Sequence, residues 1–224
     1  MARRLLWVTI ENIELFSNGE VPGAKLAAGE EKRNAVIASL TYPRSGAPSV
    51  VSALQFTVPE KTAFTPDQTD FFASGLFKEE VQEETLLQIK VTDTDQASKV
   101  GIFVLTLLTS LAGAALGTAT GGISKVLGAV VTAGVDRVQN GIPKLAAGDQ
   151  VFVIGETPKL KLKIDTIPAD SGQPLRMNLP LMVEEEVRKP YFEMDGGQAV
   201  AKELVLPKGT NNGHIIIRLW ATEL

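Results

Sequence analysis

The middle of this 224-residue chain holds 25 consecutive uncharged residues, from Val100 to Ser124. Ala, Leu and Gly dominate the run, and no proline occurs between it and Pro143. Length and composition favour one long helix, or two helices that break near Gly121, over strands. The Asn-Gly pair shortly before Pro143 is a helix stop signal. We therefore predict an Ala/Gly-rich α-helical hairpin over residues 98–147.

Short segments rich in β-branched and aromatic residues lie on both sides of this run, separated by turns rich in Gly, Pro, Asn and Ser. Alternating side chains in several of them are typical of strands with one buried face. The segments are "RLLWVTIENIEL", "RNAVIASLTY", "SVVSALQFTV", "SGLFKEEV" and "TLLQIKVTD", then "DQVFVIGE", "KLKLKID", "PLRMNLPLMVEEEV", "AVAKELVLP" and "GHIIIRLWATEL". We predict a mainly β, single-domain protein over residues 1–224: an antiparallel sandwich of about eight strands, with the helical hairpin inserted between two of them.

Composition excludes several functional classes. Lys and Arg number 22 against 26 Asp and Glu, a net charge of −4, which argues against a nucleic-acid-binding protein. The absence of cysteine excludes disulfides and thiolate chemistry. The apolar run after Arg4 is too short for a signal peptide, and Glu11 follows at once. We expect a cytoplasmic protein, peripheral to a membrane if the lipid hypothesis below holds.

Catalytic signals are scarce. His214 is the only histidine and follows an Asn-Asn-Gly turn, so paired-histidine chemistry is not available. No phosphate-binding glycine loop, dinucleotide fingerprint or nucleophile elbow occurs. Carboxylate pairs such as Glu79-Glu80 are typical of a solvated surface. We predict a non-enzymatic protein.

Two aspartates one residue apart, Asp93 and Asp95, end a strand-like segment. Calcium prefers carboxylate and carbonyl oxygens, and two aspartates in a loop at a strand end can both reach one ion. The alternative is a turn in which Asp95 or Ser98 caps the following helix.

Three segments resemble the C2 domain family. "LLQIKVTDTDQASKVGIF" is similar to the part of that fold where a strand ends in an Asp-x-Asp calcium loop, and "LLWVTIENIELF" and "LVLPKGTNNGHIIIRLWATEL" resemble its opening and closing strands. The resemblance covers roughly 50 of the 224 residues. It implies an eight-stranded sandwich that binds phospholipid or protein, with or without calcium. Asp93 and Asp95 are the residues that match calcium-ligand positions.

A row of lysines, Lys159, Lys161 and Lys163, alternates with apolar residues in "KLKLKID" and falls on one face of a strand. Such a row could attract anionic lipid headgroups, each lysine contributing about 1 kcal/mol. The alternative is an ordinary solvated face, or an edge strand that lysines protect from pairing.

Gly113, Gly117 and Gly121 repeat at four-residue spacing in the uncharged run, so on a helix they form a stripe where another helix can approach closely. The run is long enough to span a bilayer, but its Ala, Gly, Thr and Ser content makes it weakly hydrophobic. Packing on the protein or on a second subunit, conditional membrane insertion and a permanent span all remain open.

These features support three functional hypotheses. In the first, the protein is a binding module that docks on a membrane or lipid surface, aided by a divalent cation at Asp93 and Asp95. In the second, it is a structural or adaptor subunit of a larger complex that packs through the glycine stripe, with a homo-oligomer as one form. In the third, it is a secreted effector that inserts into a target membrane.

Overall fold

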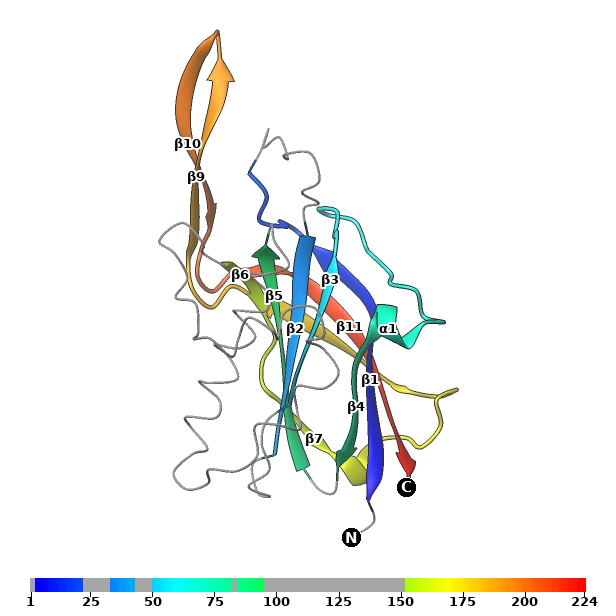
Figure 1. Ribbon diagram of the computed structural model, residues 1–224. Helices are drawn as coiled ribbons and strands as arrows, with labels where there is room; N and C mark the ends of the chain where they lie inside the picture. The colour runs from blue at the N-terminus through cyan, green and yellow to red at the C-terminus, as the bar shows by residue number, and fades with distance from the viewer. Residues whose placement is uncertain (1–2, 22–32, 43–49, 82–83, 95–151) are drawn as a thin grey trace, which may run out of the picture.

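The computed structural model describes residues 3–21, 33–42, 50–81, 84–94 and 152–224 (Figure 1). Eleven strands and two single-turn helices make up these parts. The strands are β1 (Arg4–Leu15), β2 (Arg33–Thr41), β3 (Val50–Phe56), β4 (Gly75–Val81), β5 (Glu84–Thr94), β6 (Phe152–Glu156), β7 (Leu160–Lys163), β8 (Leu175–Met182), β9 (Val187–Asp195), β10 (Gln198–Leu206) and β11 (Asn211–Glu223). The helices are α1 (Phe71–Ser74) and the 3-10 turn η3 (Ile164–Thr166).

One antiparallel sheet holds nine of the strands. Eight follow the order β3-β2-β5-β6-β8-β11-β1-β4, and β7 pairs separately with β5. The two ends of this path, β3 and β4, come close without pairing, so the sheet is nearly closed and barrel-like. The remaining strands, β9 and β10, pair with each other in a separate two-stranded sheet.

Alternating apolar residues fill the inside of the curled sheet. In β1, Leu6, Val8 and Ile10 are fully buried, and after a register shift Ile13 and Leu15 are fully buried as well. The shift between Ile10 and Asn12 is a β-bulge, which changes the alternation by one residue and bends the strand. The bulge therefore keeps apolar side chains of both halves of β1 inside while the sheet curls.

The predicted fold class is corrected by this topology. The chain is mainly β, as predicted, but its strands form one near-closed sheet and a separate hairpin rather than a two-layered sandwich. Strand alternation shows which side chains are buried together, but it does not show whether the buried faces belong to two sheets or to one curled sheet. The helical hairpin gains no support: α1 and η3 are the only helices in the described residues, and residues 98–147 lie outside them. None of the described helices has the length and apolar character needed to cross a membrane.

Tyr42 provides a spectroscopic probe of the sheet interior. It follows β2 and packs against the core, where burial and then the nearby carboxylates Glu79 and Glu80 raise its pKa to about 12. The chain has two tyrosines, so Tyr191→Phe leaves Tyr42 as the only phenol. We expect ultraviolet difference absorbance of this variant to show ionisation near pH 12. Adding Glu79→Gln should lower the midpoint while leaving it above 10, because burial is the larger cause; a midpoint near 10 in either variant contradicts the buried placement.

Candidate functional site

The β9–β10 hairpin projects beyond the main sheet as an arm (Figure 1). Its strands pair from Val187↔Leu206 at the base to Asp195↔Gln198 at the tip. Gly196 and Gly197 form the two-residue turn with φ values of +55° and +84°, the left-handed backbone that such a hairpin turn requires. Among the described residues, these two strands pair only with each other. An isolated two-stranded hairpin is marginally stable in water, so an arm of this length is expected to contact something else.

One face of the arm is apolar. Phe192 and Met194 on β9 lie beside Ala201 and Ala199 on β10, and all four side chains share one face because alternate residues of a strand point to the same side. Phe192 is 75% exposed and Met194 69% exposed, and both alanines are exposed. We call these four residues the apolar face of the arm. Large apolar side chains gathered at an exposed position are typical of an interaction surface.

The opposite face is mixed over the same length, because Tyr191, Glu193, Val200 and Lys202 lie on it. Lys202 pairs with Glu193 across the two strands, and this hydrogen bond raises the pKa of Lys202. Nearer the base, and on the same face as Phe192, Arg188 contacts Glu203 at 3.0 Å; it also contacts Glu186 at 2.6 Å. The apolar face therefore occupies the outer part of the arm, and an exposed ion pair borders it on the side of the body.

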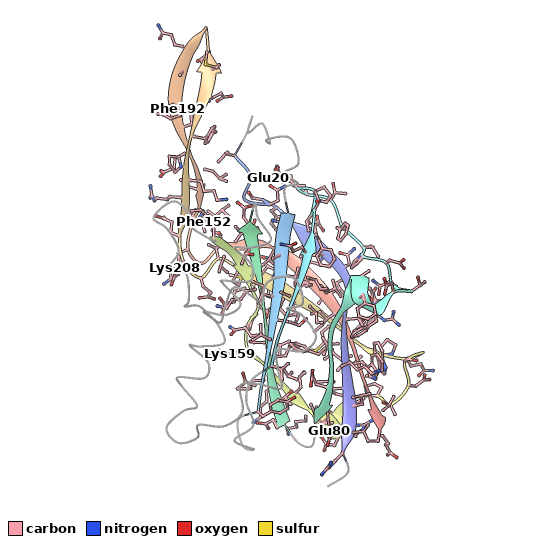
Figure 2. All side chains as sticks on the ribbon, viewed as in Figure 1. Glu20, Glu80, Phe152, Lys159, Phe192 and Lys208 are labelled. Atoms are coloured by element: carbon pink, nitrogen blue, oxygen red, sulfur yellow. The ribbon has the colours of Figure 1, made fainter. Side chains whose placement is uncertain are left out.

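The arm is attached to the main sheet at its base. Val187 and Leu206 are buried in the core. Beyond them, the Lys189 ammonium forms an ion pair with the Asp93 carboxylate of β5, and the two side chains are only 16% and 8% exposed. Lys189 Nζ also donates to the carbonyl of Gly19 at 2.9 Å and lies 4.7 Å from the ring centroid of Phe152 (labelled in Figure 2). One lysine of the arm thus contacts three separate segments of the body.

Buried amides complete the surroundings of Asp93. Asn34 donates to the carbonyl of Asn18 at 2.9 Å, and Asn18 donates to the carbonyl of Val58 at 3.3 Å. A Cβ atom on Gly19 would lie 2.8 Å from the Asp93 Cβ, and Gly19 has φ +82°, so only glycine fits without strain. The end of β5 is a packed polar junction between the body and the arm.

No family model matches the chain, and neither does any curated protein.

Of the two predicted calcium ligands, the structure describes only Asp93. Asp93 is buried and paired with Lys189, so its charge is already compensated, and Asp95 lies outside the described residues. The parts of the chain that the structure describes contain no group of three or more His, Cys, Asp or Glu side chains able to hold a metal. Calcium binding gains no support and stays a prediction.

The lysine row lies at the other end of β5 from the arm. Lys161 and Lys163 belong to β7, which pairs with β5 alone, and exposed Lys159 precedes this strand on the body (Figure 2). Lys161 pairs with Glu84 at 2.9 Å. Lysines on an edge strand are typical of protection against pairing with other chains. Lipid binding by this row stays a prediction.

One further prediction remains untested. The glycine stripe of Gly113, Gly117 and Gly121 lies outside the described residues. His214 lies at the start of β11, where its Nε2 is 3.8 Å from a Glu14 carboxylate oxygen.

Sequence reasoning predicted the second strand of the arm, "AVAKELVLP", but missed the first strand and the turn. The segment "RKPYFEMDGG" was not recognised as a strand and turn, although an Asp-Gly-Gly turn between alternating segments is a hairpin signal. Pro190 and the charged residues around it weakened the strand pattern. A search for a turn flanked by two alternating segments could have found Phe192 and Met194.

Proposed function

We propose that the protein is a non-enzymatic assembly module that docks on other protein subunits through the β9–β10 arm. The exposed apolar face at the end of a projecting hairpin is the observation that carries this proposal. Burying a Phe and a Met side chain contributes about 1.5–3 kcal/mol each. Burial of these two side chains would therefore contribute favourable free energy to a docking contact with another protein.

The charge of the arm favours a protein surface over an anionic lipid surface. The whole arm, from Val187 to Leu206, carries three basic and three acidic side chains, a net charge of 3 − 3 = 0, so it has no excess of positive charge for anionic lipid. Of the three basic residues, Lys189 forms a largely buried ion pair with Asp93 of the body. The lysine row is remote: Lys161 pairs opposite Leu86, seven residues along β5 from Asp93, or about 23 Å. The apolar face and the lysine row therefore do not form one membrane-facing surface.

Site-specific photo-cross-linking in cells of the source organism tests the proposal. A photo-reactive residue at Phe192 is expected to give one discrete protein adduct, and the same residue at Lys159 on the body is the matched control. Met194→Asp, which puts a charge into the apolar face, should reduce the Phe192 adduct at least tenfold. Equal adducts at Phe192 and Lys159, or adducts to lipid in place of protein, would contradict docking through the arm.

A further inference from the structure

The two outer edges of the arm differ in their ability to accept another strand. In an antiparallel pair, residues alternate between exchanging hydrogen bonds with each other and pointing their backbone groups outward. The pair at the turn, Asp195 and Gln198, is of the bonded kind, since it closes a two-residue turn. Counting back along the register, the backbone N–H and C=O groups of Phe192 and Pro190 on β9 point away from β10. Those of their partners Ala201 and Glu203 on β10 point away from β9. The placement of Pro190 agrees, because proline has no N–H to give to β10.

Pro190 closes one edge and leaves the other open. On β9 the outward positions are Arg188, Pro190, Phe192 and Met194, so the N–H that another strand would need is missing at Pro190. On β10 the outward positions are Ala199, Ala201, Glu203 and Val205, and each has an N–H. These four residues are exposed, and β10 has no described partner on this edge. An extended strand can therefore add to β10 but not along the whole of β9.

We infer that the strand that adds to β10 is the β10 strand of a second copy of this chain, in antiparallel orientation with Ala201 on the two-fold axis. The inference rests on the proposed docking function of the arm and names its partner. In this register Ala201 faces the partner's Ala201, Val200 faces the partner's Lys202, and Ala199 faces the partner's Glu203.

Charge and length select this register. The outward backbone N–H and C=O groups of one β10 must lie opposite those of the other, which limits the possible registers. If the axis moves to Lys202 or Glu203, that residue lies directly opposite its own copy, so that like charges face each other. Moving it to Val200 sets the Gly197 turn residue against the partner's Glu203 and shortens the ladder. With the axis at Ala201, the ladder runs from Gln198 to Leu204 within β10 of both copies.

The resulting four-stranded sheet extends the apolar face. Phe192 pairs with Ala201, so the two copies line up as Phe192, Ala201, the partner's Ala201 and the partner's Phe192 across one face. The bodies lie at opposite ends because the strands are antiparallel. We expect a contact made by the two arms alone to be smaller than the ~1,200 Å² of a stable interface, with a dissociation constant in the micromolar range or weaker.

Sedimentation velocity over a concentration series of about 1 µM to 1 mM, the range that spans such affinities, tests the pairing. The wild type should shift from monomer to dimer. Ala201→Pro removes one outward N–H without breaking the β9–β10 ladder, and it should weaken dimerisation at least tenfold. Ala201→Thr keeps the N–H and should dimerise like the wild type. A wild type that stays monomeric, or an Ala201→Pro dimer of unchanged affinity, overturns the inference.

Spin labelling tests the register. The chain has no cysteine, so Val205→Cys gives a single labelling site. With the axis at Ala201, the two Val205 Cα atoms stand eight residues apart along the ladder, or about 27 Å. Double electron–electron resonance should show one distance near this value that disappears in Ala201→Pro; any other distance overturns the register. A Phe192 photo-adduct to a different protein with a monomeric wild type overturns self-pairing but leaves the proposed function standing.

Discussion

Replacing Lys189 by methionine is expected to lower the free energy of unfolding by about 3–5 kcal/mol, because the Asp93 carboxylate then stays buried without its cation. Methionine keeps most of the apolar stem of lysine, so the loss reports the charge rather than the packing. Adding Asp93→Asn should recover a large part of the loss, since a neutral amide costs less to bury than a carboxylate. Urea unfolding followed by the fluorescence of Trp7 and Trp220 measures all three stabilities.

Lys202→Met is the matched control. Lys202 is also a lysine of the arm paired with a carboxylate, that of Glu193, but both side chains are nearly half exposed. Exposed ion pairs contribute about 0–1 kcal/mol, so this variant should stay close to the wild type. Equal losses at Lys189 and Lys202 would show that the Asp93 pair is not the attachment of the arm described above.

Replacing Gly213 by alanine is expected to cost at least about 3 kcal/mol, in the range of the most damaging single substitutions. A Cβ atom at this position would lie 2.0 Å from the carbonyl oxygen of Glu14 and 3.0 Å from the Cα of Leu15. Both atoms belong to the backbone of β1, which pairs with β11 along its whole length and cannot move away alone. The φ of +134° adds strain for any L-residue.

Gly209→Ala separates the two causes. Gly209 also has a positive φ, +79°, but nothing lies within 4 Å of its missing Cβ. Left-handed backbone alone costs an alanine about 1–2 kcal/mol. Thermal and urea unfolding should therefore show a clearly larger loss for Gly213→Ala than for Gly209→Ala. Similar losses would mean that β1 and β11 are not packed as closely as the structure places them.

Local pattern was sufficient to predict most strands. The segment "RLLWVTIENIEL" coincides with β1, and "RNAVIASLTY" and "TLLQIKVTD" overlap β2 and β5 almost completely, because alternation and β-branched content act within a few residues. The arrangement of strands could not be predicted in the same way. β1 pairs with β11 at the far end of the chain. Alternation shows which face of a strand is buried, but it does not show which other strand it pairs with.

The surroundings of Asp93 could not be predicted from sequence either, because they are formed by residues distant in the chain. An Asp-x-Asp segment is compatible with a cation site, a turn or an ion pair, and its sequence does not name the partner. Lys189, which forms the ion pair with Asp93, comes from a hairpin almost a hundred residues later. The apolar face was missed for a related reason: in the sequence Phe192 and Met194 resemble core residues, and only the structure shows that both are exposed.

The pairing of β5 with β6 sets the geometry that a re-engineered connection would have to match. Asp93 stands opposite Phe152, so two positions 59 residues apart in the chain are direct neighbours across a strand pair. Directly paired residues of antiparallel strands have Cα atoms about 5 Å apart. A shortened or exchanged segment joining β5 to β6 must therefore bring its two ends back to this separation.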